Sequence, residues 1–290
     1  MTPESLVRAT ENLFSLPDVV LRVNQLIDEP ATRPADLAEV ILCDPGLSAR
    51  LLRVVNSAFY AQPKPVETVS QAIGLIGFQA LRDLIMATAA VDLFKGLPPE
   101  KVNMEHFWLH GVACGIAARD LAARRGLRNG ERLFLAGLLH GLGRLMFFSQ
   151  CADAYREVLR LVEREQLDSV AAEERVFGFN HVELGAELLR AWRFPESIWK
   201  VVAARLDPAL AGAYRAEAEI LQVAERVARQ VAATAIDTGE IASVDASDEL
   251  KVLAERWSLE PDALLDLPGA TSLRAFEVFE ILLPGSTLVY

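Results

Sequence analysis

Apolar residues recur at helical spacing along almost the whole chain, and this periodicity constrains the fold more than any other feature. In the stretch 16–27 they return every three or four positions, and Pro30 follows shortly afterwards. Such spacing places apolar side chains on one face of a helix, and proline ends it. The alternating pattern typical of strands is scarce. We therefore predict an all-α protein built from packed helices.

Composition and charge narrow the class of protein further. The 290 residues are 52% hydrophobic, and 29 basic against 40 acidic residues give a net charge of −11. An acidic chain repels nucleic-acid phosphates, so we expect no nucleic-acid partner. The most apolar stretch, 133–148, is shorter than the roughly 20 residues of a membrane span. The N-terminus shows no signal-peptide pattern, and the three cysteines are widely spaced. We expect a cytoplasmic protein with reduced thiols and no membrane association.

Local signals divide the chain into helical blocks. Asp44 followed by Pro45 is typical of a helix start, Thr68 with Gln71 forms a capping-box pattern, and Gly77 is suited to a helix end. The composition changes to Lys, Gly and Pro over 95–99. We predict an N-terminal helical lobe over 1–98, a second helical lobe over 99–235 and a helical extension over 236–290.

Four histidines are the main candidates for chemistry. His106 and His110 lie one turn apart, His140 lies in a nearly all-apolar helix, and His181 follows the helix cap Asn180. Histidines from three helices that converge in an all-α core could bind a metal ion. The alternative is that His140 is a core histidine bonded to a carbonyl, with the others at helix edges. The spacing alone leaves both interpretations open.

Two groups of segments resemble the HDOD domain, a family of bacterial regulatory modules related to HD-type metal-dependent phosphohydrolases. In the first group the segments are LP at 16–17, CDPGLSARLLR at 43–53, NSAFY at 56–60 and QAIGLIG at 71–77. In the second they are FWLH at 107–110, AGLLHGLGRL at 136–145 and HVELGA at 181–186, followed by Trp192, Pro195 and Ile198. The resemblance covers about residues 10–235. It implies a second lobe with an HD-like helical bundle.

Departures from the pattern of active HD enzymes imply a degenerate metal site. Those enzymes carry a His-Asp pair, whose carboxylate anchors the metal, whereas here His140 is followed by Gly141. Arg205 stands where relatives often carry histidine, and Glu225 where they carry a late aspartate. The ligand set that remains by resemblance is His110, His140, His181 and Glu225. We expect no cofactor beyond, at most, a single weakly bound divalent metal, because Arg205 would repel a dication.

The expected function is a non-catalytic signal-transduction module that binds other signalling proteins, with the groove between the lobes as the contact surface. Two alternatives stay open: a metal-dependent phosphohydrolase, and a nucleotide sensor that uses the vacated HD site. Residues of the family signature expected to be structural are Asp44, Pro45, Asn56, Ser57 and Gly77. Residues expected to contact a partner or ligand are Arg50, Arg53, Trp108 and Arg205.

Overall fold

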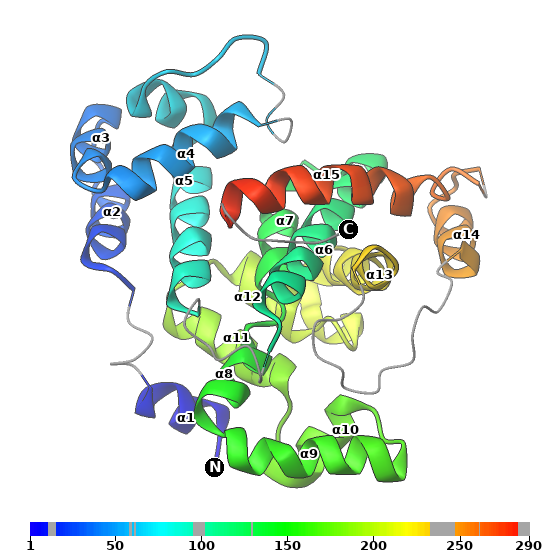
Figure 1. Ribbon diagram of the computed structural model, residues 1–290. Helices are drawn as coiled ribbons and strands as arrows, with labels where there is room; N and C mark the ends of the chain where they lie inside the picture. The colour runs from blue at the N-terminus through cyan, green and yellow to red at the C-terminus, as the bar shows by residue number, and fades with distance from the viewer. Residues whose placement is uncertain are drawn as a thin grey trace.

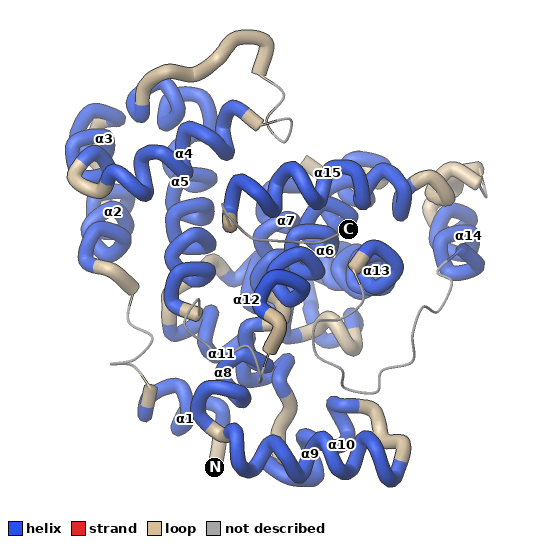
Figure 2. Tube along the Cα trace, viewed as in Figure 1, coloured by secondary structure: helices blue, strands red, loops and turns tan. Residues whose placement is uncertain are grey.

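All regular structure in the described part of the chain is helical, which confirms the predicted all-α class (Figure 2). The computed structural model describes residues 1–10, 16–57, 60, 62–94, 102–128, 130–232, 247–260 and 262–283. The predicted lobe boundary at 98 and the change of composition at 95–99 lie outside these residues, as does the start of the predicted extension at 236.

The N-terminal lobe consists of four helices that pack on one another. They are α2 (Asp18–Asp28), α3 (Pro34–Leu42), α4 (Pro45–Asn56) and α5 (Val69–Leu93). The first helix, α1 (Pro3–Ala9), packs instead against α11 of the second lobe (Figure 1). Its residues Leu6 and Val7 are buried. The long helix α5 also contacts α7, so it joins the two lobes.

The second lobe is built around the helix pair α6 (Met104–Arg124) and α7 (Gly130–Leu139). Its other members are α8 (Leu142–Gln150), α9 (Ala152–Glu165), α10 (Ser169–Phe177), α11 (His181–Ala191), α12 (Glu196–Ala203), the 3-10 helix η1 (Pro208–Tyr214) and α13 (Arg215–Val231). Two further helices, α14 (Ser247–Arg256) and α15 (Leu267–Leu282), belong to the extension. Figure 1 shows α15 lying across α6 and α13, both of which it contacts.

The predicted helix ends are confirmed at three positions. The Asp44 side chain accepts a hydrogen bond of 2.9 Å from the Leu47 backbone N–H, at the start of α4. Thr68 and Gln71 form the expected capping box at the start of α5. Gly77 has a φ of +80°, so the backbone leaves helical geometry there and α5 is broken into two segments.

Asn56, which was expected to be structural, is the last residue of α4. Its backbone is not left-handed, since Asn56 is not among the described residues with positive φ. Its side chain instead bonds both backbone groups of Val66, at 2.7 and 2.8 Å. Asn56 therefore fixes the proline-rich loop onto the end of α4, a long-range role that local pattern does not reveal.

One continuous hydrophobic core runs through both lobes and the extension. Two apolar stretches, Val69–Leu93 and Gly130–Gln150, have the length and composition that could cross a membrane, but 56% and 83% of their most apolar windows are buried inside the protein. Burial of this kind is typical of the core helices of a soluble protein.

Glycines allow the central helices of the second lobe to approach closely. A Cβ atom at Gly143, on α8, would overlap the backbone carbonyl of His181 and lie 2.7 Å from the backbone nitrogen of Gly185, on α11. A Cβ at Gly137 would lie 2.5 Å from the backbone of Gly115. These contacts set the position of the helices that carry the histidines.

We expect Gly143→Ala to lower the free energy of unfolding by about 3 kcal/mol, because the methyl group meets rigid backbone on α11. The matched control is Gly269→Ala on α15, where a Cβ atom has no neighbour within 4 Å. That control should stabilise the protein by about 0.5 to 1 kcal/mol, since alanine favours the helix. Chemical denaturation measures both; equal effects of the two substitutions would contradict the close approach.

Candidate functional site

Three helical elements bring His110, His140 and Glu225 together in the second lobe. His110 lies on α6, His140 directly follows α7, and Glu225 lies on α13. One potential ligand atom from each of these residues lies within 4.8 Å of the others, and all three side chains are buried. The rings of His110 and His140 have centroids 5.4 Å apart. Of the four ligands that the resemblance implied, these three lie together, and His181 is not part of this group.

Backbone carbonyls fix the two histidine rings. Nδ1 of His140 lies 2.5 Å from the Gly137 carbonyl oxygen, and Nδ1 of His110 lies 3.3 Å from that of Ala232. Burial lowers the pKa of His110 to about 4 and that of His140 to about 3, against the opposing effect of the Glu225 carboxylate. Both rings are therefore neutral at physiological pH, with Nδ1 as donor and Nε2 as the free nitrogen.

Arg205 reaches into this cluster and bonds two of the expected metal ligands. Its guanidinium donates to Oε2 of Glu225 through Nη1, and its Nη2 lies 2.6 Å from Nε2 of His181. Arg229 donates to the other oxygen of Glu225, at 3.1 Å. Burial would raise the pKa of Glu225, but the guanidinium groups of Arg205 and Arg229 hold that pKa well below its usual range. The carboxylate is thus ionised and already neutralised by arginines.

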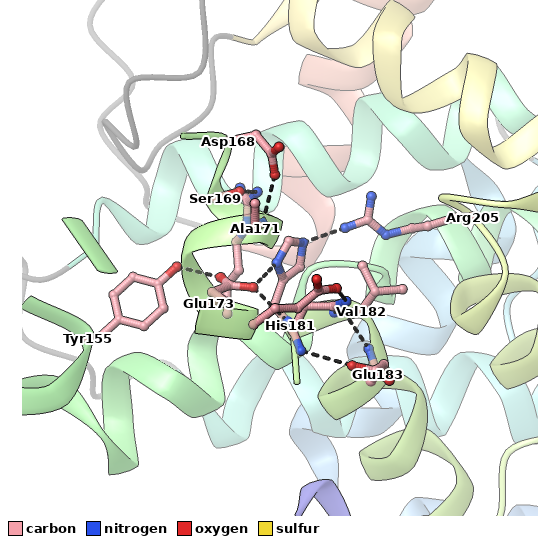
Figure 3. A network of polar contacts seen from close by, with 12 residues as sticks. Tyr155, Asp168, Ser169, Ala171, Glu173, His181, Val182, Glu183 and Arg205 are labelled. Atoms are coloured by element: carbon pink, nitrogen blue, oxygen red, sulfur yellow. Dashed lines mark hydrogen bonds and ion pairs between the residues drawn. The ribbon is translucent and has the colours of Figure 1, made fainter. Parts of the chain in front are cut away.

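A second carboxylate orients His181, as Figure 3 shows. Nδ1 of His181 lies 2.6 Å from Oε2 of Glu173, which also accepts the backbone N–H of His181 at 2.7 Å. The other oxygen of Glu173 accepts a hydrogen bond of 2.7 Å from the Tyr155 hydroxyl. Because Nδ1 carries the proton donated to Glu173, Nε2 must accept from Arg205. The lone pair on Nε2 of His181 therefore accepts a hydrogen bond from Arg205.

Phe107 fills the space next to Gly141, where HD enzymes place their aspartate. A Cβ atom at position 141 would lie 2.9 Å from two carbons of the Phe107 ring. The cavity that remains among the cluster residues has a volume of about 20 Å³. A single water molecule needs about 10–15 Å³ by this measure, so the space suits one water and not a nucleotide.

Several residues singled out from the sequence lie away from the cluster. Trp108 was expected to contact a partner, but it is completely buried in the core and offers no surface. Arg50 forms an ion pair of 2.7 Å with Asp92. Arg53 is exposed on α4, and His106 is exposed although His110, one turn later, is buried.

Sequence reasoning missed Glu173, Tyr155 and Phe107. Glu173 lies eight residues before His181 and is fully buried. Glutamate is ordinarily exposed, and Glu173 is followed by a second glutamate, so the sequence carries no signal of its burial.

Comparison with known proteins matches this arrangement to one family. The model of the HDOD domain matches residues 13–208. A protein from Shewanella amazonensis SB2B with the provisional name phosphohydrolase has a solved structure with a TM-score of 0.70 and 24% identity; the match covers 96% of this chain and 97% of that one. An HDOD domain protein of unknown function from Geobacter sulfurreducens has a solved structure with a TM-score of 0.65 and 26% identity. The match covers 98% of this chain and 89% of that one.

A curated relative extends well beyond the matched region. An uncharacterized protein of Treponema pallidum (strain Nichols) is 24% identical over 198 residues, which are 67% of this chain and 37% of that protein.

We expect Arg205→Ala to lower the free energy of unfolding by about 3 to 5 kcal/mol, because it leaves a buried carboxylate with less compensation. The matched control is Arg156→Ala, since Arg156 is paired with Asp153 on the surface and is 71% exposed. The control should change stability by less than about 0.5 kcal/mol. Urea denaturation measures both, and a loss no larger than that of the control would show that the buried ion pair contributes little.

Proposed function

Because this chain belongs to the HDOD domain family, we propose that it is a non-catalytic signalling module of the cytoplasm that acts by binding other signalling proteins. A regulatory role is what the resemblance implies for modules of this kind. The distinction from an enzyme depends on the histidine cluster, since the family is related to metal-dependent phosphohydrolases.

The observation that carries the proposal is the position of the Arg205 guanidinium. It lies between Glu225 and His181, two of the residues that would hold the metal. A dication there would have to displace or approach a buried positive charge, which costs Coulomb energy in an environment of low polarity. Arg205 thus takes the place of the ion in satisfying Glu225.

The cluster also offers too few free metal ligands for a hydrolytic site. A hydrolytic metal needs about three protein ligands and an open position for water. Nε2 of His181 is already bonded to Arg205. Gly141 stands where HD enzymes carry aspartate, and the Phe107 ring covers it. The residues present do not fit a catalytic metal. The small cavity likewise disfavours the nucleotide sensor at this position.

One observation favours the enzyme alternative to a limited extent. The ligand atoms of His110, His140 and Glu225 lie within 4.8 Å of one another, so a single ion could be held if Arg205 moved away from Glu225. The Shewanella relative with the provisional name phosphohydrolase has the same fold, but at 24% identity this likeness extends to the fold alone.

Metal analysis and a phosphatase assay on protein purified without a histidine tag test the proposal. We expect less than about 0.1 zinc, manganese or iron per chain, and no turnover of p-nitrophenyl phosphate with any of these ions added, for lack of free ligands. Arg205→Ala should bind zinc more tightly than the wild type, because the competing cation is gone. Stoichiometric metal with turnover in the wild type would overturn the proposal.

The interaction itself is tested by affinity purification from the native host after cross-linking. We expect a signalling protein to be recovered with the wild type and equally with Phe107→Leu, because that substitution alters only the buried cluster. Recovery of no signalling protein under conditions that cross-link known complexes would count against this part of the proposal.

A further inference from the structure

A second and much larger cavity lies between the two lobes, apart from the histidine cluster. Its described lining comes from α4 and α5 on one side and from α6, α7 and α15 on the other, and its volume is about 690 Å³. Pockets of about 300–1,000 Å³ are typical of small-molecule sites. None of His110, His140, His181 and Glu225 lines it.

One oxygen of a buried carboxylate beside this cavity has no hydrogen-bond partner among the described residues. Asp83, on α5, is only 2% exposed and lines the cavity. Its Oδ1 has no hydrogen-bond partner among the described residues. A buried polar atom without a partner is costly, and such atoms in a native protein call for a specific explanation. A bound molecule that donates N–H groups would supply the missing bonds.

The charges around the cavity limit which molecules would fit. Arg119, Arg128 and Arg132 line it, against the two carboxylates of Asp83 and Glu131. Arg128 and Arg132 are exposed, whereas Asp83 is deep. The arginines can therefore bind an anionic group at the mouth while the carboxylate meets a donor group inside. The walls between them are apolar and include Leu84, Phe134 and Leu138.

We propose that this cavity binds a guanine mononucleotide, with the base against Asp83 and the phosphate at Arg128 and Arg132. Guanine presents two adjacent N–H donors on one edge, which match the two oxygens of a carboxylate. A neutral apolar molecule would leave Asp83 unpaired, and inorganic phosphate would leave the deep end empty. The proposal is independent of the histidine cluster and would give the module a chemical signal to sense at the junction of its lobes.

Calorimetric titration of the full chain with GMP, guanosine and inorganic phosphate tests this site. We expect GMP to bind, guanosine to bind more weakly, and phosphate not to bind. Asp83→Asn should lower the affinity for GMP by about tenfold or more, which is the loss expected when a charge-assisted hydrogen bond is removed. Arg128→Ala should weaken the binding of GMP but leave the affinity for guanosine unchanged. The control Asp153→Asn removes a carboxylate that is 93% exposed on α9 and should change none of these affinities.

The unliganded protein gives a second readout that does not depend on the choice of nucleotide. Burial raises the pKa of Asp83 to about 6, with Arg132, Arg82 and Glu131 as its charged neighbours. Tyr60, whose own pKa is raised by burial and in part by Asp83, also lines the cavity. An acid whose pKa is raised on folding destabilises the protein as pH increases through that value. The wild type should therefore lose stability between about pH 4 and pH 6 relative to Asp83→Asn, which should be the more stable of the two at pH 8.

Two results would overturn the proposal of a nucleotide site. One is failure of the wild type to bind GMP, and the other is equal GMP affinity in the wild type and Asp83→Asn. Equal stability of these two proteins at pH 8 would show that Asp83 already has a partner. None of these outcomes bears on metal content or phosphatase activity, so this inference and the proposed function fail separately.

Discussion

The buried contact between Arg205 and Glu225 determines what the second lobe can do. A guanidinium and a carboxylate satisfy each other where related enzymes would need an ion, and the histidines around them are neutral because they are buried. His181 is held in one tautomer by Glu173, which makes its second nitrogen an acceptor for the same arginine. The cluster is therefore a polar network enclosed in an apolar core, and its hydrogen bonds and ion pairs favour a single arrangement of the surrounding helices.

Close helix contacts make this network possible. Gly143 on α8 lets α11 approach with its first residue, His181, next to His140, and the Gly137–Gly115 contact places α7 against α6. Together these contacts set the spacing of the elements that carry the cluster. Phe107, one turn before Gly111 on α6, then covers Gly141. Phe107 thus fills the volume beside Gly141 while Arg205 bonds Glu225, so the packing of the cluster and the pairing of its polar groups go together.

Local structure was predictable from the sequence to a large extent, while the partners of buried polar groups were not. Asp44, Thr68 and Gly77 act through bonds or backbone angles within a few residues, so their patterns are sufficient. The involvement of Arg205 and Glu225 followed from resemblance to a family, not from spacing. Glu173 and Asp83 were missed because each looks like an ordinary exposed residue of an amphipathic helix. Their burial is decided by other helices, α11 for Glu173 and α7 for Asp83.

The first two helices belong to different lobes. The chain begins on the second lobe, where α1 covers α11, and only then enters the N-terminal lobe through α2. Cleavage of the chain between the two lobes would leave α1 attached to the N-terminal lobe. The apolar residues of α11 that α1 covers would then be exposed. The lobes are thus interlocked by topology, and a change of angle between them must be accommodated at both ends of the N-terminal lobe.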